Sequence, residues 1–544
     1  MKRKLGTVIA FVLIAIMAMP VGVFARAMDD VTRRVEGGQV FVPLREAAEA
    51  HGWTVDWVSN TQEVLLINPV SGYVNRFHID LLVLLLGGFV ENGVTWIPYE
   101  IAVELFETIS FILHLSEEGQ AIALSDFDFL VDFILENTPW DGLIDRLFIA
   151  GGFEGIMGTT SEWLEDMRPM QFTIADQELF DAQIPSHPGD TPREEAANYL
   201  FMLLVAGLSP MLGGIGHLGP RTLDLYTAQT VSFSRQRDSM YYWGYDTTFL
   251  DIFLEAFLHP SAIWFYGEVD MEADERDLIP AVPGNVQTYI FDDIAILRID
   301  SFLVDESYDE AIIVPFLYEI QDFAHLIIDI RGNFGGFMSY PIVQIFSRLI
   351  NEPTVVSSHE FFVGSDLGLR VMQGMANLDT WDENRSYVRP AAPFIEARGM
   401  IYFNEYDKAR LDYVRVTYSV FHPCEYAFGF EGKIWLLVDQ NSASASNMLV
   451  EMMQYTGLAT VVGTNTSRVM SATHVYIALP YTGIVFRADL GYRTDGLGRS
   501  LEFYGITPDI TIPLWADALD YVLALIDGEP LAGLPHPKDT GIPF

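Results

Sequence analysis

The sequence predicts an α/β protein of several domains, and two observations support that prediction. Within residues 286–527, apolar runs of strand length alternate with helical spacing, as where Ile434 to Val438 is followed by Met448, Leu449 and Met452. The length of 544 residues also exceeds what one hydrophobic core usually organises. We therefore expect an α/β core with smaller domains before it.

Residues 1–25 have the pattern of a secretory signal. Basic residues at positions 2–4 precede an apolar run from Leu5 to Met19. Val23 to Ala25, which ends in a small residue, follows at the place where a signal would be cleaved. The apolar run is near the lower length limit for a membrane span, so an N-terminal anchor is the alternative. Both interpretations predict export, to the cell envelope or the extracellular space.

The second predicted domain comprises residues 30–115. Val40 to Asn68 has the pattern of a strand, a helix and a hairpin, and Phe89 to Phe106 repeats the strand, proline and helix of Val40 to Ala50. These segments resemble the copper amine oxidase N-terminal-like domain of bacterial exported proteins. The resemblance implies a small α+β, stalk-like spacer, and the family name implies no copper here.

Residues 120–285 are predicted to be mainly helical, with a break rich in Pro, Gly and Asp from Ile184 to Pro192. Tyr199 to Leu208 is apolar enough for a helix, and a glycine-rich turn that contains His217 follows it. No PDZ pattern occurs between His217 and the strand at Ile294. This region is expected to form a helical cap, and residues 528–544, rich in Pro and Gly, a loose tail.

Within the predicted core, a block of small residues joins a strand to a helix. Asn441 to Ser446 occupies that turn, so a serine hydroxyl falls at a helix N-terminus. Unpaired N–H groups and the positive end of the helix dipole suit the oxyanion of acyl transfer. Ser442, Ser444 and Ser446 are the candidates, and helix capping is their alternative role.

A second turn follows an apolar strand, in the run HLIIDIRGNFGGFM from His325 to Met338. Its glycines let the backbone approach a ligand closely, although a tight turn alone would also use them. Together with the strand-like run from Ile294 to Phe302, these segments resemble the S41 peptidase family of C-terminal processing and tricorn-like proteases. The resemblance implies a ClpP/crotonase-like α/β core with a serine nucleophile.

One branch of that family pairs the serine with a lysine. Gly463 to Val469 aligns with the lysine-bearing turn, and Val469 stands at the lysine position. Arg468 is no substitute, because a guanidinium stays protonated in proteins. Beyond the signal segment, the chain has only three lysines, none at a useful distance after the serine helix: Lys408, Lys433 and Lys538. The Ser-Lys arrangement is therefore disfavoured.

The tricorn-like branch instead uses a histidine and a downstream glutamate. The glycine-rich turn with His217 matches the histidine segment, and Gly498 to Ile510, GRSLEFYGITPDI, matches the closing segment, which contains Glu502. Imidazole titrates near neutrality and can take a hydroxyl proton, while a carboxylate orients the imidazole. The resemblance therefore implies Ser444 as nucleophile, His217 as base and Glu502 as the orienting carboxylate.

By the same resemblance, the backbone N–H of Ala445 supplies one oxyanion donor, and Gly335 or Gly336 supplies the other. His474 is the alternative base, although the alternating pattern of Thr473 to Leu479 indicates a strand residue.

Composition excludes several classes of function. The formal charge of −43, from 74 acidic and 31 basic residues, disfavours nucleic acid and anionic membrane surfaces as partners. Cys424 is the only cysteine, so no intrachain disulfide can form. No metal-ligand spacing and no nucleotide-binding loop occurs, and no cofactor or metal is implied.

These observations together predict an exported serine peptidase that acts on peptide or protein substrates. The alternative is a catalytically inactive module of the same fold that binds a peptide or another ligand. A membrane association would come only from the N-terminal segment.

Overall fold

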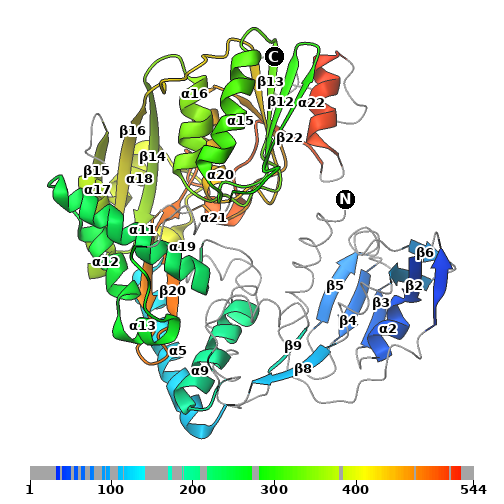
Figure 1. Ribbon diagram of the computed structural model, residues 1–544, viewed down its shortest axis with the longest axis vertical. Coiled ribbons are helices and arrows are strands. Elements are labelled where there is room, and N and C mark those ends of the chain that lie inside the picture. Colours follow the sequence, from blue (N-terminus) through cyan, green and yellow to red (C-terminus); the bar gives the residue numbers. More distant parts are fainter. Residues whose placement is uncertain are drawn as a thin grey trace.

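The structure is a computed structural model, shown in Figure 1. It describes residues 32–36, 39–50, 54–58, 63–67, 74–78, 89–91, 94–98, 108–113, 115–140, 164, 170–173, 187, 189–208, 217–272, 281–378, 384–470, 473–513 and 516–528. The predicted signal segment and nearly all of the predicted tail lie outside the described residues.

The core contains a six-stranded sheet in the order β11-β12-β13-β17-β18-β22. Its strands are β11 (Val286–Phe291), β12 (Ile294–Ile299), β13 (His325–Asp329), β17 (Lys433–Val438), β18 (Thr460–Gly463) and β22 (Ile510–Thr511). All neighbours pair in parallel except β11 with β12. Both faces of a parallel sheet are normally covered by helices, which accounts for the continuous apolar runs in these strands.

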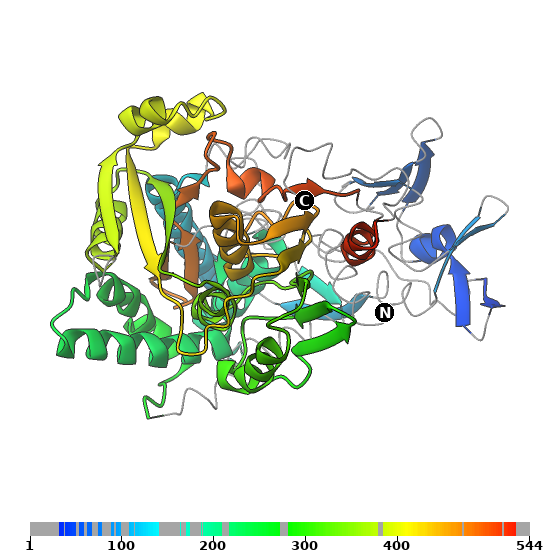
Figure 2. The same cartoon turned by 90° about the horizontal axis from the view of Figure 1, so that it is seen from above.

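Helices cover both faces of this sheet: α15 (Glu306–Glu319) and α20 (Ala445–Thr456) on one, and α22 (Ala518–Ile526) on the other (Figures 1 and 2). Alternate residues of one strand reach opposite sides, because Leu436 packs in the cluster with α15 and α20, whereas Leu437 packs with α22. The predicted α/β class of the core is confirmed.

A second, antiparallel sheet has the order β15-β16-β14-β21 and extends the core. Its strands are β14 (Thr354–Phe362), β15 (Arg385–Pro390), β16 (Tyr413–Phe421) and β21 (Tyr492–Arg493). The connecting helices are η3 (Pro341–Phe346), α16 (Ser347–Leu349), α17 (Asp366–Leu378), α18 (Ala391–Arg398), α19 (Glu405–Arg410) and α21 (Leu501–Tyr504).

Among its described residues, the predicted helical cap contains helices and two short strands, of which β9 (Met170–Thr173) pairs with β8 (Thr108–Leu113). Its described helices are α5 (Glu117–Asn137), α9 (Pro192–Met202), η2 (Leu203–Leu208), α11 (Leu223–Tyr242), α12 (Thr248–Phe257) and α13 (Pro260–Tyr266). The short strand β10 (Gly219–Pro220) joins β20 (Val485–Asp489) and β19 (His474–Ala478) in a three-stranded sheet of order β10-β20-β19. The cap and the C-terminal half of the core therefore share one sheet.

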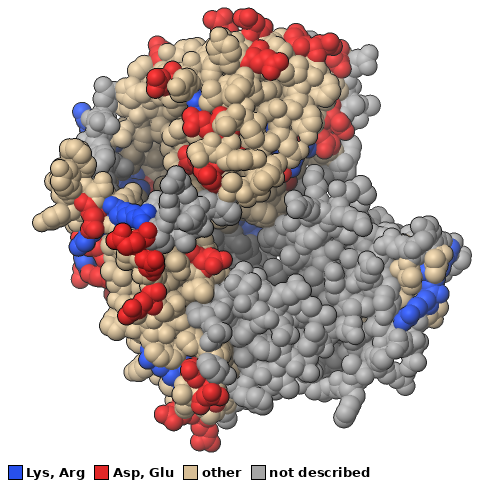
Figure 3. Space-filling model, viewed as in Figure 1, with Lys and Arg blue, Asp and Glu red and all other residues tan. Residues whose placement is uncertain are grey.

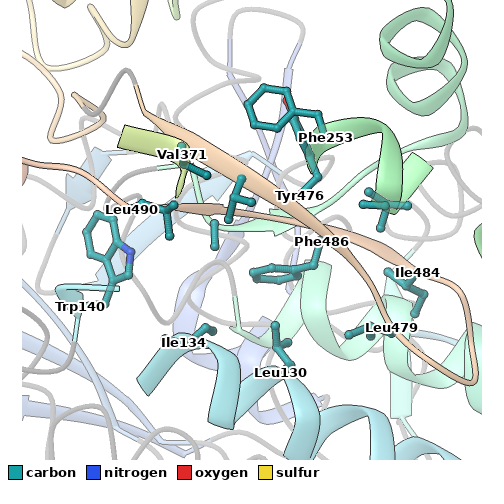
Figure 4. Close-up of a cluster of buried hydrophobic side chains, with 14 of the residues drawn as sticks. Leu130, Ile134, Trp140, Phe253, Val371, Tyr476, Leu479, Ile484, Phe486 and Leu490 are labelled. Atoms are coloured by element: carbon teal, nitrogen blue, oxygen red, sulfur yellow. The ribbon is translucent and has the colours of Figure 1, made fainter. Parts of the chain in front are cut away.

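The hairpin of β19 and β20 lies between two cap helices (Figure 4). Phe486 points toward Leu130 and Ile134 of α5, and Tyr476 on the opposite face packs edge-on against Phe253 of α12. The turn of the hairpin is held by Asp126 of α5, which accepts hydrogen bonds from the backbone of Tyr481 and Thr482. This packing fixes the position of the strand that carries Asp489.

The N-terminal region has the strand, helix and hairpin that Val40 to Asn68 predicts: β2 (Gln39–Pro43), α2 (Leu44–Ala50), β3 (Thr54–Val58) and β4 (Glu63–Ile67). The remaining strands of this region are β1 (Arg34–Glu36), β5 (Val74–His78), β6 (Phe89–Glu91), β7 (Val94–Pro98) and β8 (Thr108–Leu113). The second predicted helix, before Phe106, lies outside the described residues. Among the described helices, none combines the length and the apolar character needed to cross a bilayer.

Candidate active site

Ser444 lies in a strained turn between β17 and α20. Its φ and ψ angles are 55° and −116°, and it is one of two non-glycine residues with positive φ in the described chain. Such a conformation costs on the order of 1–3 kcal/mol and persists where the surrounding structure enforces it. Serine at this position usually caps the helix through its hydroxyl. The Ser444 side chain makes no such capping hydrogen bond.

The two flanking serines are structural. Ser442 is fully buried, and its hydroxyl donates to the carbonyl of Ile330 at 3.0 Å. Ser446 is also buried and donates to the carbonyl of Asn333 at 3.0 Å. These two serines therefore have a structural role, although their hydroxyls bind loop carbonyls and do not cap the helix, and Ser444 is the member of the block whose hydroxyl lies beside an imidazole.

The predicted base is His217, whose Nε2 lies 2.8 Å from Ser444 Oγ. The histidine lies two residues before Gly219, the first residue of β10, which pairs with Arg487 of β20 in antiparallel register. Because the two strands are antiparallel, the residue two positions before Gly219 lies opposite the residue two positions after Arg487. His217 therefore lies opposite Asp489. The structure thus brings together the predicted nucleophile and the predicted base, from segments 227 residues apart.

Asp489 orients the imidazole. Its Oδ2 lies 3.0 Å from His217 Nδ1 and also accepts a hydrogen bond of 2.7 Å from the backbone N–H of His217. Because a carboxylate only accepts, Nδ1 carries the proton and Nε2 accepts from the Ser444 hydroxyl. The indole of the buried Trp140 donates to the Asp489 carbonyl at 2.8 Å, which anchors this end of β20.

The position of Glu502 differs from the sequence prediction. Glu502 lies in α21, is fully buried and accepts from the backbone N–H of Arg493 at 3.1 Å to each oxygen. The hydrogen bond to the His217 ring that was predicted for Glu502 is made by Asp489. The physical reason is the pairing of β10 with β20, which places a different carboxylate beside the imidazole.

The geometry also distinguishes between the two glycines that the sequence offers as oxyanion donors. Gly335 N–H already donates to Asn333 Oδ1 at 2.8 Å, whereas the N–H groups of Gly336 and Ala445 have no acceptor among the described residues. Gly335 is required for close approach instead, because a Cβ there would lie 2.5 Å from the Ala443 carbonyl oxygen. Of the two glycine alternatives, Gly336 together with Ala445 fits the role.

The surroundings of His217 favour its neutral form. Burial lowers the pKa of His217, and the nearby charges of Arg487 and Arg221 lower it further, while Asp489 raises it through its charge and its hydrogen bond. The net direction is downward. A neutral imidazole is the form that can accept the serine proton.

His474, the alternative base, lies in β19 as its alternating pattern predicts, and it pairs with Asp489 on the far side from His217. Its Nδ1 is 3.1 Å from Arg487 Nη2, and its ring stacks on Phe253. The contact to the Ser444 hydroxyl belongs to His217.

Asp489 was not identified from the sequence, although a signal was present. The run VFRADL from Val485 to Leu490 is an apolar strand that contains an acidic residue, and a carboxylate buried in a strand requires a specific partner. No group of three or more potential metal-ligating side chains occurs among the described residues.

Two family models match the chain. Residues 293–512 match Peptidase family S41, and residues 25–71 match the copper amine oxidase N-terminal domain, which confirms both sequence resemblances. No curated protein matches the chain.

Solved structures match at low identity. A candidate peptidase from Parabacteroides merdae is 16% identical with a TM-score of 0.38, over 76% of this chain and 98% of that chain. A lipoprotein from Streptococcus agalactiae is 12% identical with a TM-score of 0.33, over 75% of this chain and 96% of that chain. The tricorn protease is 16% identical with a TM-score of 0.25, over 44% of this chain and 18% of that chain.

Proposed function

We propose, from the premise that the chain carries a peptidase family S41 domain, that it is an exported serine peptidase with Ser444, His217 and Asp489 as its triad. The observation that carries the proposal is the continuous chain of contacts from Ser444 Oγ through both ring nitrogens of His217 to Asp489. Nucleophile, base and orienting carboxylate within hydrogen-bond reach are the signature of acyl transfer.

In the first half of the reaction, Ser444 Oγ attacks the carbonyl carbon of the scissile peptide bond while His217 Nε2 takes its proton. The carbonyl oxygen becomes an oxyanion, which the N–H groups of Ala445 and Gly336 stabilise. His217 then gives the proton to the leaving amine, and an acyl-enzyme on Ser444 remains.

In the second half, His217 removes a proton from water, which attacks the acyl-enzyme. The tetrahedral intermediate collapses to a carboxylic acid, and the proton returns to Ser444 Oγ. No step requires a metal or a cofactor. The same proposal includes three further features. The core has a ClpP/crotonase-like arrangement, residues 1–25 direct export, and the substrates are proteins or peptides.

The test is digestion of a peptide library by the intact protein and by Ser444→Ala. Loss of the nucleophile should lower kcat on the order of 10⁶-fold. Unfolding temperature should change little, since alanine keeps the backbone of the turn. A fluorophosphonate probe provides a second readout, because it should label Ser444 in the intact protein and fail to do so in His217→Ala.

The matched control is His474→Ala, which removes the second histidine beside Asp489. It should retain labelling of Ser444 and most hydrolysis. Undiminished turnover in Ser444→Ala, or labelling that depends on His474 and not on His217, would contradict the assignment. Intact peptide binding without any hydrolysis by the unmodified protein would instead indicate a catalytically inactive binding module.

A further inference from the structure

Gly336, one of the two proposed oxyanion donors, lies against the chain just after β12. The N–H of Phe302 donates to the Gly335 carbonyl, and the N–H of Phe337 donates to the Phe302 carbonyl, both at 3.0 Å. These two hydrogen bonds flank Gly336 and form a short parallel bridge between Phe302 and Gly336. The Gly336 N–H itself takes no part in the bridge, so the position of Phe302 sets where this donor lies.

The loop has no free space on either side of its two glycines. A Cβ on Gly336 would lie 2.2 Å from the carbonyl carbon of Phe302, and the φ angle of 144° also disfavours other residues. On the opposite side, a Cβ on Gly335 would lie 2.5 Å from the Ala443 carbonyl oxygen, in the turn between β17 and α20. The loop therefore lies between Phe302 and the nucleophile turn, and a displacement of Phe302 would also displace the Gly336 N–H.

The side chain of Phe302 is held by Tyr340. The two rings are fully buried and stacked, with centroids 4.9 Å apart and an interplanar angle of 23°. Tyr340 follows Gly336 by four residues, and its hydroxyl donates to Asp309 Oδ2 at 2.6 Å. Asp309 belongs to α15, so this hydrogen bond connects the segment after the oxyanion loop to a helix of the core.

Asp309 has an unusual environment for an acidic residue of this chain. The formal charge is −43, and acidic side chains are spread over the face drawn in Figure 3, whereas Asp309 is only 1% exposed. Its Oδ2 accepts from Tyr340 and from Asn285 Nδ2, each at 2.6 Å, and its Oδ1 has no hydrogen-bond partner among the described residues. A buried carboxylate with so few donors depends on each of them, which fixes the Tyr340 hydroxyl.

We propose that Tyr340 and Asp309 are positioning residues for the oxyanion donor at Gly336. The inference rests on the proposed peptidase function. The contacts run from Asp309 through the hydroxyl and ring of Tyr340 to Phe302, and from the Phe302 backbone to Gly336. A donor that is already in place stabilises the oxyanion without reorganisation. Loosening it should therefore weaken binding of the transition state and leave binding of the intact substrate unchanged.

Tyr340→Phe tests this proposal, because it keeps the stacked ring and removes only the hydroxyl. Since complete loss of an oxyanion donor lowers kcat on the order of 10²–10³-fold, misplacement of one should lower kcat on the order of tenfold, with KM nearly unchanged. The matched control is Tyr226→Phe, which removes an equally buried hydroxyl that donates to the Phe257 carbonyl, also at 2.6 Å. Unchanged kcat in Tyr340→Phe, or an equal fall in both variants, would overturn the proposal.

Variants of Asp309 test whether the hydroxyl acts through this carboxylate. Asp309→Asn keeps a side-chain oxygen that can accept from Tyr340, so it should retain most of kcat, whereas Asp309→Ala should lose as much as Tyr340→Phe. The double variant Asp309→Ala/Tyr340→Phe should lose no more than either single variant, because both remove one interaction. Losses that multiply in the double variant would contradict a shared role.

An inhibitor provides a readout that core packing alone would not change. A peptide aldehyde made from the best-cleaved library peptide forms a hemiacetal with Ser444, and its oxygen occupies the oxyanion site. In Tyr340→Phe, the inhibition constant of the aldehyde should rise by the same factor as kcat falls. The uncleaved peptide should bind equally to Ser444→Ala with and without Tyr340→Phe. An unchanged inhibition constant, or an equal loss of peptide affinity, would refute the positioning role.

Hydrogen exchange separates this inference from the proposed function, because it needs no catalysis. In Ser444→Ala, the addition of Tyr340→Phe should accelerate exchange of the Phe302 and Phe337 N–H groups, whose hydrogen bonds hold the loop. The addition of Tyr226→Phe should leave both unchanged. If the intact protein hydrolyses no peptide but exchange responds in this way, the peptidase proposal fails and the support of the loop by Tyr340 is upheld. If peptides are hydrolysed but neither exchange nor kcat responds, the positioning role alone is refuted.

Discussion

Two carboxylates, Asp489 and Glu502, are both fully buried but have different surroundings. Asp489 lies at the end of β20 and contacts the ring and the backbone N–H of His217. Glu502 lies in α21 and accepts both of its hydrogen bonds from the backbone of Arg493. In the proposed triad, Asp489 therefore orients the imidazole, whereas Glu502 binds the backbone of Arg493 in β21.

Burial dominates the electrostatic environment of Glu502. Burial raises the pKa of Glu502 well above its ordinary value, and hydrogen bonds from the backbone and the charge of Arg493 only partly oppose it. A carboxyl group whose folded pKa is raised stabilises the fold below its unfolded pKa, and that contribution is lost as pH rises through the folded pKa. Burial alone thus does not distinguish the two carboxylates, whereas contact with the imidazole does.

The largest expected effect comes from exchanging each carboxylate for its amide. Asp489→Asn should lower kcat/KM by about 10⁴-fold, because the amide favours the wrong tautomer of His217. Glu502→Gln is the matched control and should change kcat/KM less than about tenfold. Its unfolding temperature should stay level or rise at pH 8, since the neutral amide removes the cost of ionising a buried group.

The reverse ranking of these two variants would restore Glu502 as the orienting residue. Circular dichroism and thermal unfolding of both proteins should accompany the kinetics, so that a loss of fold is not taken for a loss of catalysis.

A smaller effect concerns pH. The base form of His217 is required, and its pKa is lowered by burial and then by Arg487 and Arg221. The acid limb of kcat/KM should therefore have its midpoint below the ordinary histidine value of about 6.5, with a tenfold fall per pH unit beneath it. Removing a cation in Arg487→Gln should move the midpoint upward, while Glu502→Gln should leave it in place. A midpoint above 7 in the unmodified protein would contradict this environment.

The smallest effect concerns the support of Asp489 by Trp140. Trp140→Phe removes the hydrogen bond to the Asp489 carbonyl, which should cost about 1–3 kcal/mol of stability and lower kcat/KM severalfold. Tyr226→Phe is a control, because it removes an equivalent buried bond to the Phe257 carbonyl. The control should lose similar stability but keep its kcat/KM. Equal kinetic losses in both variants would show that the effect is general loosening of the cap.

Much of the site could be predicted from local patterns. The strand, small-residue turn and helix around Ser444 are encoded by adjacent residues, because each element has its own periodicity and the turn separates them. The glycines at positions 335 and 336 were recognisable for the same reason, since close backbone approach requires residues without a Cβ. His217 was found through its resemblance to a family segment, and the structure places it against Ser444.

The sequence by itself determined the α/β class, the turn that carries Ser444 and the absence of a usable lysine, since these depend on residue type and local spacing. Only the tertiary structure decided which carboxylate meets His217 and which glycine N–H is free for an oxyanion. Both choices depend on contacts between distant segments: the pairing of β10 with β20 and the hydrogen bond from Gly335 to Asn333. Strand register is set by packing of the whole sheet, so a change of two residues would have brought Arg487 instead of Asp489 opposite the imidazole.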